Sequence, residues 1–326
     1  MPYEIDMLNV GNADAIILRY INGQDEEYIV VIDAGKTEAH GKKVVEHIQK
    51  HTVKKSIDLA ISTHPDKDHI NGFFYVVDHI NIEEFWIHDP GAQEVDQNEI
   101  THFFGDAYFE KGLKYVMESI TFAKDLITII DEKSILRKEP FAGLEHINIP
   151  IIVLGPSRTY YREKLLGFRD YHLFEGTELK KSYPNDSNEE AWNKKKKDFD
   201  KLRDRSSENN SSTIILFYGD DKKVLFTSDT GPEALEHVIN TNDLKNLDFL
   251  DVPHHGSKNN LNTVIMDVLS PKTAYISCEG NYPDSFIVDY LSFKGARVFC
   301  TKIHGGIRHS YLMPTRDGWQ SIKPMS

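Results

Sequence analysis

The sequence of 326 residues has few cysteines, a shortage of positive charge and no long apolar run. Its two cysteines, Cys278 and Cys300, stand far apart, and its first residues form no apolar signal segment, so we expect no disulfide framework and a reduced, cytoplasmic protein. No apolar stretch approaches the length that crosses a bilayer, which predicts a soluble protein with no membrane partner. Lys and Arg number 38 against 51 Asp and Glu, a formal net charge of −13, and this balance argues against a broad basic face for duplex nucleic acid.

The apolar runs predict an α/β fold. Residues 15–21 and 28–32 flank the turn signal Asn22-Gly23, and an apolar stripe at helical spacing follows between residues 41 and 51. Further strands are expected at residues 57–61, 149–154, 213–218, 224–227, 247–252, 273–277 and 297–301, with helices at about 112–130, 232–239 and 283–294. Strands that alternate with helices place functional loops after the carboxyl ends of the strands.

The densest cluster of reactive side chains lies in residues 62–69, directly after an apolar run. His64 and Asp66 are two apart, so their side chains leave an extended segment on the same side, whereas the adjacent Asp68 and His69 diverge. A loop with both pairs can serve two metal ions, each with an open position for water. The alternative is that one Asp caps the helix that follows, which leaves the second Asp and both histidines unexplained.

Two later strand ends carry further metal-capable side chains. Asp229 follows residues 224–227, and the turn Val252-Pro253-His254-His255-Gly256-Ser257 follows another apolar run. Asp229 could instead cap the helix that Pro232 opens, and paired histidines in a turn are often incidental. Three strand ends with such groups are much less frequent by chance than one, so we expect them to converge.

Two segments, residues 95–145 and 157–208, carry no ligand cluster. We expect both to be insertions in a single domain spanning residues 1–326. The second contains the basic runs 194–197 and 201–205, which favour a solvated helix face or a surface insertion, with contact to nucleic acid as the alternative.

Several motifs, taken in chain order, resemble the metallo-β-lactamase fold superfamily and, within it, the branch typified by the hydrolase-like domain of the ComEC DNA-uptake proteins. The matching segments are residues 8–15, 31–35, 63–72, 209–213, 227–231 and 252–257. The resemblance implies an α/β fold of the αββα four-layer type, in which two sheets lie face to face with helices outside and metal ions at one edge. It covers most of the chain outside the two insertions.

The resemblance also implies two divalent metal ions. His64 and Asp66 would hold one ion, and Asp68 and His69 the other, with Asp229 bridging the two. The ligand types at these positions suit ions bound through nitrogen and oxygen.

Further residues have expected roles in ligation, catalysis and substrate binding. His254 is expected to complete a ligand set, although the sequence leaves open whether His254 or His255 points inward. The expected catalytic carboxylates are Asp66, Asp68 and Asp229. The residues expected to contact the substrate are His255, Ser257, Lys258 and Asn210, and the alternative for Lys258 is an ordinary surface lysine.

The sequence departs from the wider superfamily at two ligand positions. Asp66 stands where the superfamily has His, and no His stands near Asn209 or Asn210, where a further ligand is usual. His304 and His309 are the alternatives that could supply the missing ligand, although the position of each is more typical of an ordinary loop histidine. Because oxygen-rich sites favour harder ions, we expect the site to accept Mn²⁺, with Zn²⁺ and Mg²⁺ as competitors.

The expected reaction is hydrolysis of a phosphodiester in nucleic acid or nucleotides by a metal-activated water. The chain would then be a metal-dependent hydrolase, with a nuclease or phosphodiesterase favoured. Two alternatives stay open: hydrolysis of another ester, a thioester or a lactone, and a non-catalytic metal-binding partner in a multi-protein bacterial system, with protein contacts through the insertions.

Overall fold

The computed structural model describes residues 1–93, 109–166, 189–204, 206–316 and 322–325, and its strands form two sheets. The strands of the first sheet are β1 (Tyr3–Met7), β2 (Ala15–Ile21), β3 (Glu27–Ala34), β4 (Ile57–Ile61), β5 (Ile82–Trp86), β6 (Leu136–Lys138) and β13 (Ile307–Tyr311). Those of the second sheet are β7 (Ile151–Gly155), β8 (Ile214–Gly219), β9 (Lys222–Phe226), β10 (Phe249–Asp251), β11 (Thr273–Ile276) and β12 (Arg297–Cys300).

Helices connect the strands and cover the sheets. In the first half of the chain they are α1 (Glu38–His51), α2 (Lys67–Ile70), α3 (Phe73–His79), α5 (Phe109–Glu132) and α6 (Arg158–Leu166). In the second half they are α7 (Glu189–Phe199), α8 (Ser207–Asn210), α9 (Pro232–Thr241), α10 (Thr263–Leu269), α11 (Ser285–Phe293), α12 (Thr301–His304) and the 3₁₀ turn η2 (His254–Gly256).

The two sheets share one pattern of connections. In the first sheet the antiparallel pair β2 and β3 leads into the parallel strands β4, β5 and β6. In the second sheet the antiparallel pair β8 and β9 leads into the parallel strands β10, β11 and β12. Parallel strands bring their carboxyl ends to the same edge of a sheet, so each sheet presents a row of loops at one edge.

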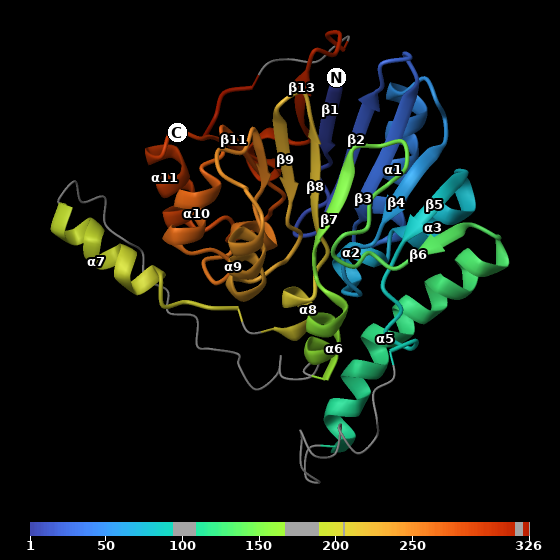
Figure 1. The fold of residues 1–326 in the computed structure, drawn as a ribbon, viewed down its shortest axis with the longest axis horizontal. Coiled ribbons are helices and arrows are strands. Elements are labelled where there is room, and N and C mark those ends of the chain that lie inside the picture. The colour runs from blue at the N-terminus through green and yellow to red at the C-terminus, as the bar shows by residue number, and fades with distance from the viewer. Residues whose placement is uncertain (94–108, 167–188, 205, 317–321, 326) are drawn as a thin grey trace.

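Side chains on alternating positions of the strands fill three separate cores. In β2, Ile16, Leu18 and Tyr20 point between the two sheets, whereas Ala15 and Ile17 point toward the helices of the first half. Figure 1 shows α1, α3 and α5 on one outer face and α9, α10 and α11 on the other. The αββα four-layer arrangement that the sequence predicts is therefore confirmed.

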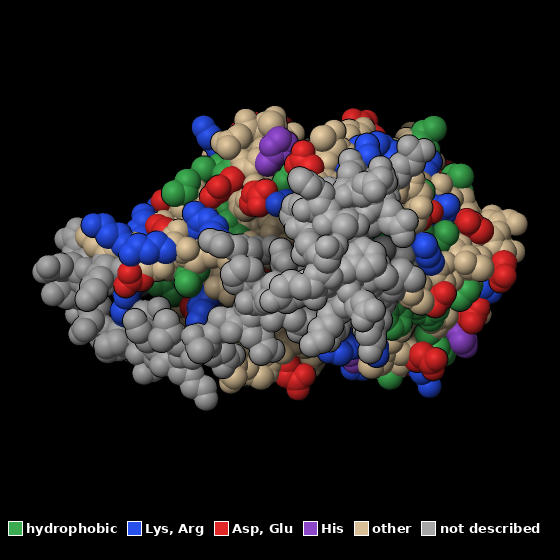
Figure 2. Space-filling model, turned by 90° about the horizontal axis from the view of Figure 1, so that it is seen from below, with side chains coloured by type: hydrophobic (Ala, Val, Ile, Leu, Met, Phe, Trp, Pro, Cys, Tyr) green, Lys and Arg blue, Asp and Glu red, His purple; other side chains and the backbone are tan. Residues whose placement is uncertain are grey.

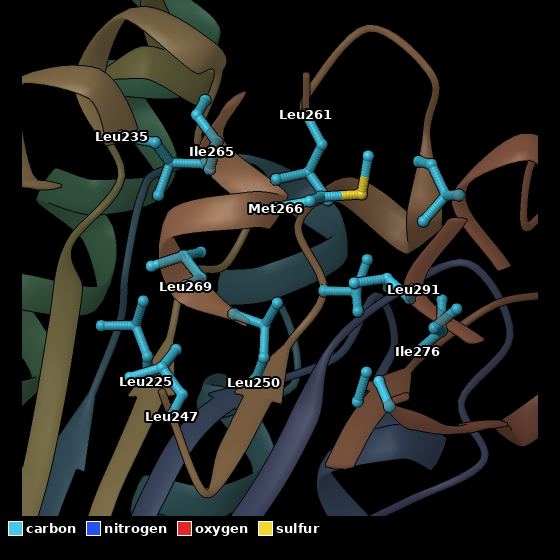
Figure 3. Close-up of a cluster of buried hydrophobic side chains, with 14 of the residues drawn as sticks. Leu225, Leu235, Leu247, Leu250, Leu261, Ile265, Met266, Leu269, Ile276 and Leu291 are labelled. Carbon is cyan, nitrogen blue, oxygen red and sulfur yellow. The ribbon is translucent and has the colours of Figure 1, made fainter. Parts of the chain in front are cut away.

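The outer core of the second sheet is built from leucine, isoleucine and methionine side chains (Figure 3). Leu225 of β9 and Leu250 of β10 are buried under Leu235 of α9 and Met266 and Leu269 of α10. Shortening such a side chain to Ala lowers the free energy of unfolding by about 2–5 kcal/mol, because a cavity replaces the lost contacts. This packing fixes the directions in which β9 and β10 deliver their loops.

Most predicted elements are confirmed, and one region adds to the sheet. The helix expected at 112–130 is α5, and both predicted hairpins form. β6 falls inside the range expected as an insertion and pairs in parallel with β5. Residues 94–108 and 167–188 lie outside the described part of the chain, so the boundaries of the two insertions stay a prediction.

The charged surface and the two cysteines of the structure can be compared with what the composition predicts. Figure 2 shows acidic and basic side chains interspersed over the described part of one face, with Lys and Arg gathered at the edge where α7 lies. Cys278 and Cys300 are buried and form no disulfide. Among the described residues, no helix is both long and apolar enough to cross a membrane.

Candidate metal centre

Loops from both sheets meet at one end of the sandwich. His69, in the loop and short helix after β4, lies with Nε2 3.4 Å from Asp229 Oδ2, and Asp229 follows β9. His254, in the turn after β10, lies with Nε2 3.7 Å from the same oxygen. The ring centroids of His64 and His69 are 4.1 Å apart. The predicted convergence of three strand ends is confirmed.

Close backbone contact holds the first of these loops against the sheet. A Cβ atom on Gly72 would lie 1.8 Å from the Ala34 carbonyl oxygen, so only glycine fits here. The Gly72 N–H donates a hydrogen bond to the Gly35 oxygen at 2.8 Å. The loop between β4 and α3 is thereby fixed beside the end of β3, which brings the residues of the two strand ends together.

The helix-cap alternatives do not account for the two aspartates. Asp66 is the N-cap residue of α2, but its side chain makes no capping hydrogen bond. Gly231, and not Asp229, is the N-cap residue of α9. Both carboxylates are therefore available for other contacts.

Four overlapping groups of side chains bring their ligand atoms within 4.8 Å of one another. The groups are His64 with His69 and Asp229, Asp68 with His69 and His255, Asp14 with Asp33 and His69, and Asp14 with Asp229 and His255. Within the described residues, none of these groups includes Asp66 or His254. His255 thus belongs to two of these groups, whereas His254 belongs to none of them although its Nε2 lies 3.7 Å from Asp229 Oδ2.

Several of the buried nitrogen and oxygen atoms in these groups make no hydrogen bond to any described residue. They are Nε2 of His64, His69 and His255, and Oδ1 of Asp229. Buried polar atoms without partners are rare in proteins and call for a bound water or ion. Imidazole nitrogens and a carboxylate oxygen that face one another suit a divalent cation.

The opposite nitrogen of each of these three rings has a partner. His69 Nδ1 lies 2.8 Å from Asp33 Oδ2, and His255 Nδ1 lies 2.9 Å from the Ser277 carbonyl oxygen. His64 Nδ1 lies 3.1 Å from Thr63 Oγ1. Because carboxylate and carbonyl oxygens only accept, Nδ1 of His69 and of His255 carries the hydrogen, which leaves Nε2 with a lone pair for a metal ion.

Charges inside the site shift the pKa values of several groups. Burial alone would raise the pKa of Asp229, but the imidazoles of His254 and His69 lower this pKa well below its usual range. Burial alone would lower the pKa of His69, but the carboxylates of Asp229 and Asp33 raise this pKa above its usual value. Burial and the nearby Asp66 carboxylate raise the pKa of Glu208 to about 8. The density of negative charge is therefore high enough to favour a cation.

Asp66 and His254, both predicted as ligands, lie at the open side of the site. The Asp66 side chain is 32% exposed and its Oδ2 lies 3.7 Å from His64 Nε2. The His254 side chain is 19% exposed, whereas those of His64 and His69 are fully buried. These two residues are accessible to a substrate as well as to an ion.

The turn after β10 directs its two histidines to different neighbours. His254 has φ 49° and His255 has φ 57°, a left-handed conformation that is uncommon outside glycine. The His254 ring faces Asp204, and the His255 ring faces Ser277. Two consecutive residues thus serve two parts of the site.

The other residues expected to contact substrate have protein partners. Asn210 Nδ2 donates to the Asp204 and Ser206 carbonyl oxygens at 3.1 and 2.8 Å. Ser257 Oγ accepts from the Asn259 N–H at 3.3 Å. Burial raises the pKa of Asp284, and the positive charge of Lys258 offsets part of that rise. A substrate role for Asn210, Ser257 and Lys258 stays a prediction.

His304 and His309, the alternatives for a missing ligand, have other contacts. His304 Nδ1 lies 2.9 Å from the Cys300 oxygen and its Nε2 lies 2.9 Å from the Lys323 oxygen. His309 is in β13, where its ring packs against Phe249. Neither histidine belongs to the groups described above.

Three carboxylates of the site were not predicted from the sequence. Asp14 lies between His69 Nδ1 and His255 Nδ1, 3.8 Å from each. Asp33 holds His69, and Asp204 holds His254. Asp14 and Asp33 stand in motifs that carry the family resemblance, which was a usable signal, whereas Asp204 stands in a polar stretch that gave none.

Comparison with known proteins gives a short sequence match and a set of similar structures. No family model matches the chain. A segment of 125 residues is 31% identical to ComE operon protein 3 of Bacillus subtilis (strain 168), and the match covers 37% of this chain and 16% of that protein. The chain thus corresponds to a minor part of this relative.

Similar solved structures include members of the metallo-β-lactamase fold. YhfI from Bacillus subtilis, described as a metallo-β-lactamase fold protein, is 10% identical with a TM-score of 0.47, and the match covers 95% of this chain and 100% of that one. Zn²⁺-bound PqqB from Methylobacterium extorquens is 8% identical with a TM-score of 0.43, covering 94% and 99%. A long form of RNase Z from yeast is 11% identical with a TM-score of 0.41, covering 94% and 42%. Likenesses of this degree carry no argument about activity.

Proposed function

We propose that the protein is a metal-dependent hydrolase that cleaves phosphodiester bonds in nucleic acid or nucleotides. The observation that carries the proposal is the set of buried, unpartnered Nε2 atoms of His64, His69 and His255 around Asp229. The chemistry of these atoms suits divalent ions such as Zn²⁺ or Mn²⁺, with Mg²⁺ as a further possibility. The metal set comprises these four residues with Asp68, and Asp14, Asp66 and His254 lie within reach of it.

Residues next to the metal set have defined tasks in this proposal. Asp33 keeps the His69 ring turned with Nε2 toward Asp229, and the Ser277 carbonyl keeps the His255 ring turned with Nε2 toward Asp68. Asp66, at the open side, accepts a hydrogen bond from the attacking water and orients it. Bound divalent ions supply the remaining chemistry, because they acidify water and neutralise charge on a phosphoryl oxygen.

The choice of a phosphodiester rests on the motif resemblance to the ComEC hydrolase-like branch. The 31% identical segment shared with ComE operon protein 3 of Bacillus subtilis supports it. The net charge of −13 disfavours binding of a polyanion over a broad surface, so the substrate's phosphate would be attracted locally by the ions. A nuclease or nucleotide phosphodiesterase meets these conditions.

The test is a parallel assay of single-stranded DNA, duplex DNA, RNA and cyclic dinucleotides with Mn²⁺, Zn²⁺ or Mg²⁺ added. We expect cleavage of at least one of these with Mn²⁺, and its loss in Asp68→Ala. Asp243→Asn is the matched control. It neutralises an exposed carboxylate that pairs with Lys223, and it should leave the rate unchanged. Turnover of a thioester or lactone without turnover of any phosphodiester would replace the proposal by the other hydrolase chemistry.

The non-catalytic alternative predicts a different result from the same variants. If the wild-type chain binds metal but hydrolyses none of these substrates, and if Asp68→Ala keeps its biological effect, the chain is a metal-stabilised partner for other proteins. Loss of the biological effect in a folded Asp68→Ala protein would support catalysis.

A further inference from the structure

Three polar side chains surround the Nδ1 atom of His254. Asp204 Oδ2 lies 3.3 Å from Nδ1, and Asn260 Oδ1 lies 3.1 Å from it. Asn209 Nδ2 lies 3.2 Å from the same nitrogen. The His254 ring is therefore held by residues from the segment before β8 and from the loop after η2.

Two of the three neighbours of Nδ1, Asp204 Oδ2 and Asn260 Oδ1, are acceptors, whereas Asn209 Nδ2 is a donor. Asp204 Oδ2 accepts from Asn209 Nδ2 and from Asn260 Nδ2, both at 2.8 Å. Because these two amide groups donate to Asp204, Asn260 presents its oxygen to His254. The His254 Nδ1–H then donates to Asp204 and Asn260, and Nε2 is the atom that faces Asp229 at 3.7 Å.

Asp204 is itself fixed by the backbone around it. Its N–H donates to the Asn259 oxygen at 2.7 Å, and its Oδ1 accepts from the Ser206 N–H at 2.8 Å. The Asp204 carboxylate is thus held on both oxygens before it meets His254. A carboxylate fixed in this way can impose an orientation on an imidazole with little loss of further entropy.

His254 differs from the other three histidines in what it faces. The Nε2 atoms of His64, His69 and His255 are buried, whereas His254 is partly exposed at the open side of the site. A group that faces both Asp229 and the solvent is in place to meet a substrate oxygen. The geometry thus separates His254 from the rings that face only the interior.

We propose that Asp204 is a positioning residue that holds His254 with Nε2 directed to the open side of the site, where its lone pair accepts a hydrogen bond from a water molecule or a hydroxyl group beside the reacting phosphate. The proposal rests on the proposed function, because a role in turnover requires a hydrolytic site. The holding of His254 by Asp204 is testable without turnover.

The first experiment is a double-mutant cycle with bis(p-nitrophenyl) phosphate and Mn²⁺ as the probe. We expect Asp204→Ala and His254→Ala each to lower kcat by about 10- to 100-fold. Because Asp204 acts through His254, the double variant should be no slower than His254→Ala. Additive losses in the double variant would overturn the proposal, since they would mean that Asp204 acts through other residues.

The second experiment reads the ring directly in the metal-free protein, through the side-chain ¹⁵N shifts of His254. The spectra are recorded above pH 9, because the carboxylates of Asp229 and Asp204 outweigh burial and raise the pKa of His254 to about 9. There we expect the neutral ring of the wild type to carry its hydrogen on Nδ1 and Asp204→Ala to populate both tautomers. Asp204→Asn keeps an acceptor oxygen and should restore part of the wild-type signal. Asp198→Ala removes an exposed carboxylate paired with Lys201 nearby in the chain and should change nothing.

The two experiments separate the two possible failures. An unchanged tautomer in a folded Asp204→Ala protein overturns the positioning role, whatever the activity. A changed tautomer in a protein whose wild type cleaves no phosphodiester overturns the proposed function and with it the catalytic part of this proposal, while the contact between Asp204 and His254 stands.

Discussion

Buried carboxylates gather in two regions of this molecule, and the regions differ in how their charge is met. In the first, Glu4 and Asp6 of β1 face the helix layer and are surrounded by Arg19, Arg308 and Arg316. In the second, Asp33 and Asp229 with their neighbours face histidines at the loop end of the sandwich. One region is filled with cations of the chain, and the other is not.

The contacts make the difference concrete. Glu4 Oε2 accepts from Arg308 Nε at 2.7 Å, and Asp6 Oδ2 accepts from Arg316 Nη2 at 2.8 Å and lies 3.0 Å from His47 Nε2. At the other region, Asp229 Oδ1 has no hydrogen-bond partner among the described residues. Guanidinium groups complete a structural cluster, whereas histidine nitrogens with free lone pairs leave room for an ion. Burial alone therefore does not identify a functional carboxylate, and the nature of its partners does.

The largest expected effect on activity comes from Asp229→Asn in the second region. We expect it to lower phosphodiesterase turnover on the order of 10³-fold, because the charge that faces three imidazoles is lost. The measurement is the Mn²⁺-dependent rate together with the metal retained by the protein after gel filtration. Retention of full activity would show that Asp229 holds no ion.

Glu4→Gln should act on the other region alone. Removing the charge leaves buried guanidinium groups incompletely paired, and we expect a loss of about 3 kcal/mol in the free energy of unfolding. Urea denaturation measures this loss, and the rate per folded molecule should stay at the wild-type value. A fall in the rate without a fall in stability would contradict a purely structural role for Glu4.

Added metal should sharpen the contrast between the two regions. At a Mn²⁺ concentration 100 times its Kd, we expect the free energy of unfolding to rise by about 2.7 kcal/mol in the wild type and in Glu4→Gln. Asp229→Asn should gain much less. Denaturation with and without Mn²⁺ checks this, and an equal gain in all three proteins would place the ion elsewhere.

The smallest effect is expected from acid acting on Asp6. Burial alone would raise the pKa of Asp6, but the contacts with His47 and Arg316 lower this pKa below its usual value. A lowered pKa in the folded state means that Asp6 contributes stability above the unfolded pKa of about 4, and that this contribution is lost as the pH falls through the folded value. The stability difference between wild type and Asp6→Asn should therefore shrink as the pH is lowered below about 4. A difference that stays constant from pH 7 to pH 3 would contradict this.

The fold was predictable where a signal is local. The apolar, β-rich run 15–21 and the turn Asn22-Gly23 identify the first hairpin, and the density of His and Asp in the loop at 62–69 identifies its candidate ligands. β6 was missed because Leu136–Lys138 is a short and partly exposed edge strand without an apolar run. Its place depends on pairing with β5, which no local pattern encodes.

The site was predictable only to the extent that its residues cluster in the sequence. Which of His254 and His255 faces the inner groups depends on two left-handed backbone positions, and a sequence does not display them. Asp204 lies 50 positions from His254 and stands among lysines and arginines that favour a solvent-exposed reading. Contacts of this kind arise only when the two sheets pack.

The loops of the site also join the two halves of the molecule. Thr63 Oγ1 and Ser228 Oγ lie 2.6 Å apart although 165 positions separate them, and the Thr213 N–H donates to the Thr63 oxygen at 3.0 Å. These bonds cross from the first sheet to the second at the same end as the histidines. Any motion that spreads the sheets must break them first, so amide hydrogen exchange at the ends of β4 and β9 should report opening of the sandwich as a single event.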